Sequence, residues 1–429
     1  MLLNQNKMKT IINYFIATAA ILLFQVNFVK AQDSTLLNLQ TIFQKIEASY
    51  PEILMYEGKI KSIQAKAEGA KSWMPPTASF GLDRFPYDFE MLKLRDDPMN
   101  EAGYMFSVEQ MIPNPAKLNA NKNYLNSLQS VQQNNAAWTK NVLRNKAKKL
   151  YYQRYIAEKK SAIIKENIDL LKLFIRTAEE RYKYNQADLS TVYKAQAQIE
   201  ELKNMQTMLF SQIAESNIGL NILMYRDINT SFEIDTAVSL RNYESLAFIT
   251  DTSFYSRSNI LSLENSIQSM RLNQKYMSSA KKPDFGLKVS HAQMFGMPNE
   301  FSVMGMVTIP IVPWSSKMYK SDVKSMEFEI EAMQKEKETM QLMAQGMIQE
   351  NLSMLKFEKE QLNNYANNIL PSYQKNLDQS LLSYKQNTGS FFVLLDAWNM
   401  SLMKQMEYLD KLNDVLKLEA AYEFEIEKK

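Results

Sequence analysis

The segment that decides the fold is TASFGLD at residues 77–83, in which Ala78, Phe80 and Leu82 alternate with small or polar residues. Three further segments alternate in the same way: residues 104–112 (YMFSVEQMI), 284–290 (DFGLKVS) and 301–309 (FSVMGMVTI). A period of two places the apolar side chains of a strand on one face. Each segment is near the length that a tilted strand needs to cross a bilayer, roughly 9–11 residues. The sequence therefore predicts four membrane-length strands, each with one apolar face.

Long helical segments separate these strands. The helix-forming stretches, rich in Gln, Glu, Lys, Leu, Ala and Met, are residues 36–73, 117–183, 190–224, 315–385 and 391–427. At 1.5 Å per residue, a helix of about 65 residues is roughly 100 Å long. A helix of that length favours a coiled coil or a helical tube over a globular domain. The fold class is therefore mainly α with a small β part.

The chain contains an internal duplication. Residues 182–185 (YKYN) are matched by residues 384–387 (YKQN), and Ile112-Pro113 with Lys117 is matched by Ile309-Pro310 with Lys317. We expect a first structural repeat at residues 32–227 and a second at 256–429, joined by a linker at 228–255. The expected hairpins and long helices are 76–113 with 117–183 in the first repeat, and 283–313 with 315–385 in the second.

The composition excludes several classes of protein. The absence of Cys excludes disulfides, thiolate metal sites, thiol nucleophiles and a lipid anchor on an N-terminal Cys. With a single His, neither a His-based zinc site nor a Ser-His-Asp triad is expected. The formal charge is only +3, from 50 Lys and Arg against 47 Asp and Glu, so no nucleic-acid partner is expected.

Residues 1–31 read as a cleaved secretory signal peptide. Lys7 and Lys9 precede an apolar run at 11–28, and residues 29–31 (VKA) fit a cleavage site. A retained signal anchor is the alternative. Removing residues 1–31 takes away three lysines and no acid, which brings the formal charge from +3 to zero. No later segment has the roughly 18 uninterrupted apolar residues of a membrane helix, so a chain in the membrane would have to use its strands.

Four strands are too few to close a membrane barrel, because the smallest barrels known have about eight. An open sheet would leave backbone groups unpaired in lipid. The barrel must therefore be shared between chains. Three chains would supply twelve strands and would also allow the long helices to close into one helical barrel, so the sequence predicts a homotrimer.

These features resemble the TolC family of outer-membrane efflux proteins over roughly residues 36–427. Within it, residues 111–118 (MIPNPAKL) and 304–320, with Pro313-Trp314-Ser315-Ser316-Lys317, look closest to the heavy-metal (CusC/CzcC-like) RND efflux branch. Ala116 stands where that branch usually has Gly. The resemblance implies a TolC-like trimer with a shared 12-stranded β-barrel in the outer membrane and a helical barrel in the periplasm. It also implies a periplasmic adaptor and an inner-membrane RND-type transporter as partners.

The resemblance also implies functional residues at the two turns between long and returning helices. The adaptor would contact Asn185, Gln186 and Ala187 at the first turn, and Asn387, Thr388 and Gly389 at the second. Plain turn chemistry without a partner is the alternative. Asp396 matches one carboxylate position of a periplasmic gate and would form a ring of three, unless it caps or pairs locally. Asp188 is a weaker candidate at the first turn.

Methionine, histidine and tryptophan give further candidates. Met326, Met333, Met340, Met347 and Met354 recur every seven residues, which fits a helix–helix seam or, because thioethers bind soft cations, a ladder for exported metal. Weak metal candidates near the second hairpin are His291, Met294, Met297, Met304 and Met306; a solvated His is the alternative. Trp73 and Trp314 lie at helix–strand joints, either at the membrane interface or packed at a bend.

We find no nucleophile–base pair, phosphate loop or metal-ligand spacing, so neither an enzyme nor a cofactor is expected. The function predicted is a passive outer-membrane exit channel of a tripartite efflux system, carrying small toxic solutes and above all heavy-metal cations. Drug export or type I secretion through the same kind of duct is one alternative. A secreted coiled-coil scaffold without a pore is the alternative from another class.

Overall fold

The computed structural model describes residues 36–93, 97, 100–184, 188–243 and 256–428. The predicted signal peptide at 1–31 and the tip residues Asn185, Gln186 and Ala187 lie outside the described residues. The described chain is mainly helical with one small sheet, which confirms the predicted fold class. Among the described helices, none carries an apolar stretch long enough to cross a membrane.

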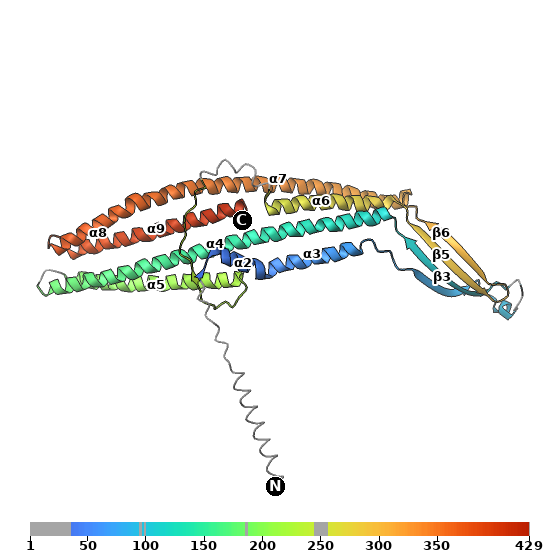
Figure 1. Cartoon of the computed structure of the whole chain (residues 1–429), viewed down its shortest axis with the longest axis horizontal. Coiled ribbons are helices and arrows are strands. Elements are labelled where there is room, and N and C mark those ends of the chain that lie inside the picture. The colour runs from blue at the N-terminus through green and yellow to red at the C-terminus, as the bar shows by residue number, and fades with distance from the viewer. Residues whose placement is uncertain (1–35, 94–96, 98–99, 185–187, 244–255, 429) are drawn as a thin grey trace, which may run out of the picture. The chain divides into compact units, whose positions relative to one another are not determined.

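The same order of elements occurs twice along the chain: a helix, a β-hairpin, a very long helix and a returning helix (Figure 1). The first series is α3 (Pro51–Gly69), β2 (Thr77–Asp83), β3 (Gly103–Ile112), α4 (Pro115–Tyr182) and α5 (Leu189–Leu223). The second is α6 (Ser258–Ser278), β5 (Phe285–Met294), β6 (Glu300–Val307), α7 (Pro313–Asn364) continuing into α8 (Leu370–Lys385), and α9 (Phe391–Glu425). Shorter elements are α2 (Leu39–Ser49), β1 (Leu36–Leu37), β4 (Glu233–Ile234), and the 3-10 turns at Phe89–Lys93 and Ser279–Lys281.

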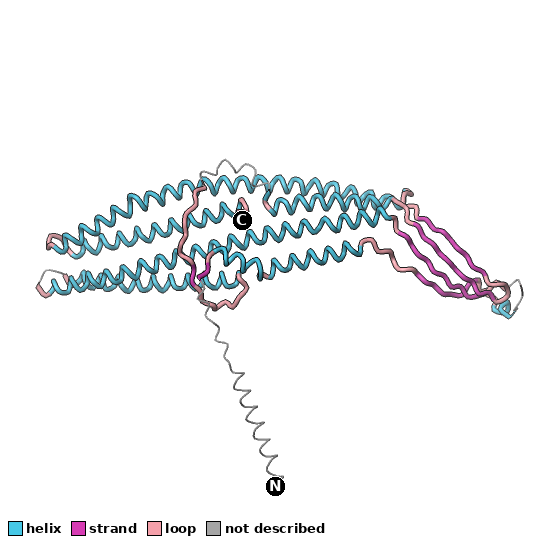
Figure 2. Tube along the Cα trace, viewed as in Figure 1, coloured by secondary structure: helices cyan, strands magenta, loops and turns pink. Residues whose placement is uncertain are grey.

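Four strands form one antiparallel sheet in the order β2-β3-β5-β6, and Figure 2 shows them side by side. The central β3–β5 pair joins the two hairpins, with Val108 opposite Val289 and Ile112 opposite Phe285. No described strand pairs with the outer edges of β2 and β6. All four predicted strands are present, with bounds within a few residues of those expected.

Two predicted helices are interrupted, and proline is the reason in both. The expected helix at 36–73 breaks between α2 and α3, where Tyr50 is extended and Pro51 opens α3, because a residue before proline is driven from helical backbone. The expected helix at 315–385 contains a π-helical turn at Tyr365–Ile369, just before Pro371. Pro371 has no N–H to bond the carbonyl four residues back, and a wider turn accommodates the loss.

One compact unit contains residues 36–46, 150–239 and 375–409 among those described. Its core lies where the second half of α4 packs with α5, α8 and the first half of α9. Leu171, Ala178, Ala195 and Leu394 are fully buried there, and Trp398 is 1% exposed. The Trp398 indole donates to Asn167 Oδ1 at 2.9 Å, which satisfies both groups inside the core.

The other compact unit contains residues 47–149, 240–374 and 410–428 among those described. It carries the sheet together with α3, the first half of α4, α6, the whole of α7 and the end of α9. Each unit therefore contains segments from both halves of the chain. The compact units do not coincide with the predicted repeats at 32–227 and 256–429, and the repeats stay a prediction from the sequence.

Candidate functional site

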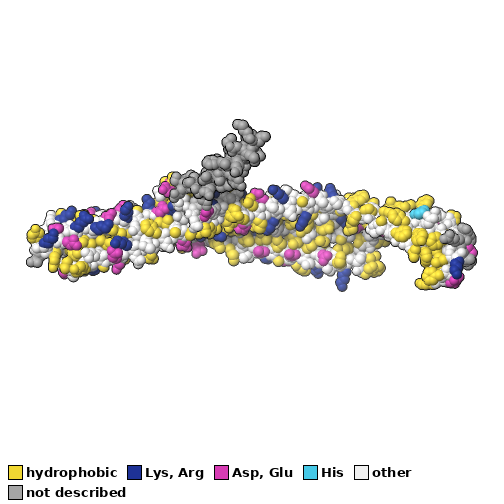
Figure 3. Space-filling model, turned by 90° about the horizontal axis from the view of Figure 1, so that it is seen from below, with side chains coloured by type: hydrophobic (Ala, Val, Ile, Leu, Met, Phe, Trp, Pro, Cys, Tyr) yellow, Lys and Arg dark blue, Asp and Glu magenta, His cyan; other side chains and the backbone are white. Residues whose placement is uncertain are grey.

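The sheet has one apolar face, and that face is exposed. Phe80, Phe106, His291 and Phe301 form one row across the four strands. Phe80 is 72% and Phe301 is 79% exposed. Figure 3 shows hydrophobic side chains gathered over the sheet. Other exposed members of the face are Leu82, Val108, Phe285, Leu287, Val289, Val303 and Val307. A contiguous apolar surface of this kind is typical of a face that meets another protein or a membrane.

The opposite face carries hydroxyl and charged groups. Ser79, Ser107, Ser290 and Ser302 lie opposite one another in a single row. The hydroxyls of Ser79 and Ser107 lie 2.7 Å apart, as do those of Ser290 and Ser302. Neighbouring rows place Glu109 opposite Lys288 and bring Glu300 to the same face. Because successive side chains of a strand point to opposite faces, one face suits lipid and the other suits water.

A salt bridge holds the joint between the first hairpin and α4. Lys117 Nζ lies 2.7 Å from Asp284 Oδ2, and Asn114 N donates to Asp284 Oδ1 at 2.8 Å. The pair thus connects the start of α4 to the residue before β5. Trp73, between α3 and β2, is 54% exposed, and Trp314, at the start of α7, is 83% exposed. More than half of each indole is exposed, and their predicted place at a membrane interface stays a prediction.

The second tip is a tightly bonded turn. Asn387 has φ 60°, a left-handed backbone that Asn tolerates better than most residues. The backbone amides of Thr388 and Gly389 both donate to the carbonyl of Ser383, at 3.0 and 3.1 Å. A Cβ on Gly389 would approach Ser383 Cβ to 3.1 Å, so the turn has little room for a larger residue. The Thr388 and Asn387 side chains are exposed at the surface of this turn.

Arg181, at the end of α4, braces this turn, and the sequence analysis did not single it out. Its Nη1 donates to the carbonyl of Tyr384 at 2.6 Å and its Nη2 to that of Lys385 at 3.0 Å. The guanidinium also lies 4.3 Å from the centre of the Tyr384 ring. A cation at the C-terminus of α8 satisfies carbonyls that have no partner within the helix. The one signal in the sequence was an Arg directly before Tyr182, the residue of the first tip that matches Tyr384.

Asp188 is a helix cap, which argues against its weaker candidacy as a gate residue. Its carboxylate accepts from the backbone N–H of Ser190 at 2.9 Å and from the Ser190 hydroxyl at 2.8 Å. These bonds, the backbone one first, lower the pKa of Asp188 below its ordinary value. The carboxylate is therefore engaged at the start of α5.

Asp396 lies on the exposed side of α9, two turns from the second tip. Within the described part of the chain its carboxylate has no hydrogen-bond or ion-pair partner, so the alternative that it caps or pairs locally is not observed. Val393 and Met400 are exposed on the same side, at 53% and 40%. Because residues three and four apart share a helix face, Asp396 stands in the middle of an exposed apolar stripe.

The structure separates the metal candidates. His291 faces the apolar side of the sheet with Val289, while Met294, Met304 and Met306 belong to the other side. Met297 follows in the β5–β6 turn. One ion held by His291 and Met294 of the same chain would therefore have to reach both faces of β5. No group of three or more His, Asp or Glu suited to a metal occurs among the described residues.

The seven-residue methionine stripe flanks the buried seam of α7 rather than forming it. The buried positions of the helix are Ser316, Ala344, Ile348, Leu355 and Leu362. Met326, Met333 and Met340 are half-buried, whereas Met347 and Met354 are 45% and 46% exposed. The helix–helix seam predicted for these thioethers is thus only partly formed within the chain.

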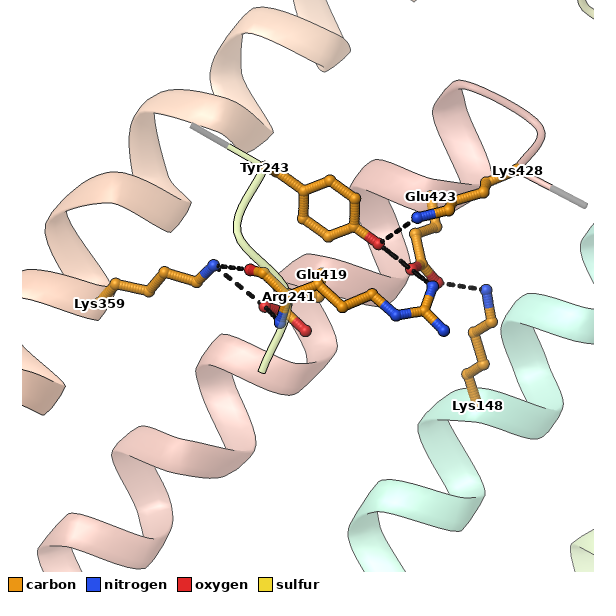
Figure 4. A network of polar contacts seen from close by, with 7 residues as sticks. All are labelled: Lys148, Arg241, Tyr243, Lys359, Glu419, Glu423 and Lys428. Atoms are coloured by element: carbon orange, nitrogen blue, oxygen red, sulfur yellow. Dashed lines mark hydrogen bonds and ion pairs between the residues drawn. The ribbon is translucent and has the colours of Figure 1, made fainter. Parts of the chain in front are cut away.

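A buried polar network, which the sequence analysis missed, ties the linker to three helices (Figure 4). Glu423 of α9 accepts from Lys148 of α4 and from Arg241 and Tyr243 of the linker. One turn earlier, Glu419 accepts from the Arg241 backbone at 3.0 Å and pairs with Lys359 of α7 at 3.1 Å. The partners are far apart in sequence, so no spacing could have indicated them.

Burial and charge act in opposite directions on these groups. Burial raises the pKa of Glu419, and burial lowers that of Lys148. For Glu423, burial acts to raise the pKa, but Lys148, Tyr243 and Arg241 together hold it below the ordinary value. Glu423 is therefore a charged anchor with three donors, which is the arrangement that makes a buried carboxylate tolerable.

The fold is shared with solved outer-membrane channels. A membrane protein from Pseudomonas aeruginosa matches with a TM-score of 0.74 at 13% identity, over 92% of each chain. CusC, whose structures concern folding and transmembrane channel formation, matches with a TM-score of 0.71 at 13% identity, over 90% of this chain and 91% of that one. The Campylobacter jejuni CmeC outer-membrane channel matches with a TM-score of 0.70 at 14% identity, over 93% and 87%. No protein-family model and no curated protein matches the sequence. The TolC-like fold is thereby confirmed.

Proposed function

We propose that this protein is the outer-membrane exit duct of an efflux assembly. The observation that carries the proposal is the exposed apolar face of the four-stranded sheet, backed by a face of serines and charged residues. A β-sheet with one apolar and one polar face is suited to form the wall of an aqueous pore in a bilayer, with the apolar face toward lipid and the polar face toward water. A secreted coiled-coil scaffold would have no use for such a sheet. The shared fold with outer-membrane channels adds support.

The duct would be a homotrimer. The outer edges of β2 and β6 carry backbone groups that no described strand pairs, and such edges are not stable in lipid. Pairing β6 of one copy with β2 of the next would close twelve strands from three chains. The exposed apolar stripe around Asp396 would face a neighbouring copy or the pore in the same assembly.

At the periplasmic end, we propose that Asn387, Thr388 and Gly389, together with residues 185–187, contact a periplasmic adaptor that links the duct to an inner-membrane RND-type transporter. The rigid turn braced by Arg181 supports this role, because a pre-formed turn loses little entropy on binding. Three Asp396 carboxylates would form the gate, since each is exposed and free of partners in the described chain.

Heavy-metal cations are the cargo that we propose. The support is the resemblance of residues 111–118 and 304–320 to the heavy-metal branch, together with the exposed thioethers of Met347 and Met354. Deleting the gene should then sensitise cells to Cu(I) or Ag(I) more than to dyes and detergents. Greater sensitivity to dyes with unchanged metal tolerance would contradict the metal cargo and leave the duct intact.

A pair of lysine substitutions on β6 tests the membrane role. Val303→Lys puts a charge on the apolar face, and Met304→Lys puts the same charge on the opposite face. A lysine facing lipid costs about 2–4 kcal/mol at mid-bilayer depth, and a lumen-facing one far less. We expect wild type and the Met304 variant to fractionate with the outer membrane as heat-sensitive trimers, and the Val303 variant to lose most of this population. Wild-type protein recovered as a soluble monomer or dimer would refute the proposal.

A further inference from the structure

A shallow basic pocket lies where the second hairpin meets α7. Lys317, Lys320 and Lys324 line it together with Ser321, over an apolar floor that includes Ile311 and Pro313. The three lysines are three and four residues apart, so they share one face of α7. All three are exposed, and none has an ion-pair partner among the described residues. The arrangement concentrates three unneutralised cations within one helical stretch.

The lysine at the equivalent position in the first half of the chain is neutralised by a carboxylate. Lys117 matches Lys317 in the sequence repeat and forms the 2.7 Å salt bridge with Asp284. Lys317 forms no such ion pair within the described residues. The second joint therefore has a lysine at the position of Lys117 but, within the described residues, no carboxylate paired with it. Of the nearby acids on the helix, Asp322 lies two residues from Lys320 and Lys324 and therefore points from another side of α7, and Glu327 lines a separate pocket with Arg271 and Lys275 of α6.

The surroundings of the pocket are those of a bilayer surface. Strand β6 ends at Val307, and the apolar Ile309, Ile311 and Trp314 that follow are 62%, 66% and 83% exposed. An exposed indole next to lysines is the composition found at the level of lipid headgroups. A lysine has a long apolar stem and a charged end, which lets it reach a phosphate from the edge of the hydrocarbon.

We propose that Lys317, Lys320 and Lys324 form a binding site for the phosphate headgroup of an anionic phospholipid in the leaflet next to the helices. The proposal rests on the membrane role proposed above. Charge complementarity selects the ligand, because three cations without acids favour a headgroup with net negative charge over a zwitterionic one. The apolar floor of the pocket favours a phosphate that carries acyl chains over free phosphate.

Tryptophan quenching by brominated lipids tests the site in the full mature chain. The chain has four Trp, of which Trp398 is buried, and Trp73→Phe leaves Trp314 as the most exposed indole beside the pocket. Protein with this substitution is reconstituted into phosphatidylcholine vesicles that contain a fixed small fraction of brominated phosphatidylcholine or brominated phosphatidylglycerol. We expect quenching by both lipids, with a several-fold excess for phosphatidylglycerol that remains when millimolar inorganic phosphate is added.

Two sets of substitutions, with equal loss of charge, separate the site from bulk electrostatics. Changing all three pocket lysines to Gln should abolish the excess, and Lys320→Gln alone should leave an excess between those of the wild type and the triple variant. The matched control changes Lys61, Lys66 and Lys356 to Gln; these lysines lie elsewhere on the chain, are exposed and have no ion-pair partner among the described residues, and the control should keep the excess. The single variant keeps the test informative if the triple variant does not assemble.

The remaining outcomes overturn either this site or its premise, and they are distinguishable. Quenching by brominated phosphatidylcholine without an excess for phosphatidylglycerol would refute the site and leave the membrane role standing. If inorganic phosphate removes the quenching excess for phosphatidylglycerol, the pocket binds free phosphate rather than a lipid. If the control substitutions lower the excess as much as the pocket substitutions do, the excess reflects the total charge of the protein and not a site. No quenching by any brominated lipid would remove Trp314 from the membrane surface and refute the proposed function as well.

Discussion

Replacing Glu423 by Gln removes the one charge on which the buried network depends. The Glu423 side chain is 4% exposed and that of Lys148 is 12% exposed, so neither can turn to water without opening the packing. Arg241 is 56% exposed and can be solvated where it stands. Most of the cost should therefore come from Lys148, which either stays charged without the Glu423 carboxylate or loses its proton.

The expected loss of unfolding free energy follows from these two possible states of Lys148. Starting from its ordinary pKa of 10.5, losing the proton at about pH 7.5 costs about 4 kcal/mol, at about 1.36 kcal/mol per pKa unit. Burial already lowers the pKa of Lys148, so the true cost is smaller. Leaving one partner of a buried pair alone costs about 3–5 kcal/mol. We expect Glu423→Gln to lower the free energy of unfolding by about 2–4 kcal/mol.

The assay is denaturant unfolding of the detergent-solubilised protein at fixed protein concentration, because assembly makes stability depend on concentration. Glu407→Gln on the same helix is the control: its ion pair with Lys404 is partly exposed, and its loss should cost no more than about 1 kcal/mol. Adding Lys148→Met to the Glu423 variant should restore much of the loss.

The pH dependence provides the refutation. In the Glu423 variant, losing the Lys148 proton becomes cheaper by about 1.36 kcal/mol for each unit of pH. The deficit relative to wild type should therefore shrink between about pH 7.5 and pH 9.5. A deficit that stays constant over this range, or a double variant no more stable than the single one, would show that Lys148 does not carry the cost.

Four further predictions concern the same structure. Asn387→Ala should destabilise the second tip by about 1–2 kcal/mol and Asn387→Gly should be close to neutral, because only the left-handed φ is at stake; the unfolding midpoint measures this. Arg181→Gln should cost about 1.5–3 kcal/mol through the lost carbonyl contacts and should raise amide exchange at residues 382–389, whereas unchanged exchange there would contradict its role as a cap. Acid should weaken wild type through Glu423: its folded pKa lies below the ordinary 4.5, so its stabilisation is present above about pH 4.5 and is lost as pH falls through the folded value, and the Gln variant should show a shallower acid transition. Asp396→Asn should weaken block of the reconstituted channel by divalent cations, and an unchanged block would remove Asp396 from the gate.

Much of the fold was predictable because its signals are local. The alternation at residues 77–83 and 301–309 depends only on which side of a strand each residue occupies, and the strands appear where it predicts them. The left-handed turn at Asn387 is equally local, since the residue's own backbone preference decides it. The two helix interruptions were also predictable from the sequence, because Pro51 and Pro371 restrict the backbone next to them.

The candidate site was less accessible to sequence. The contacts of Glu423 join α9 to residues about 180 and 275 positions away, and a charge in a helix looks the same in the sequence whether it is buried or solvated. His291 and the neighbouring methionines looked like one cluster along the chain, but the pleat of β5 sends them to opposite faces. Arg181 could not be assigned either, since the carbonyls it binds belong to a turn about 200 residues later.

By itself, the sequence determined the periodicities: where strands alternate, where helices run on without a break, and which half repeats the other. These depend on short-range geometry that each segment carries within it. Tertiary structure alone decided which charges are paired, which are buried and which remain free. Asp284 neutralises Lys117, while nothing in the described chain neutralises Lys317, although both lysines follow the same Ile-Pro joint. The energy of an ion pair depends on distance and desolvation, and both are properties of the folded chain.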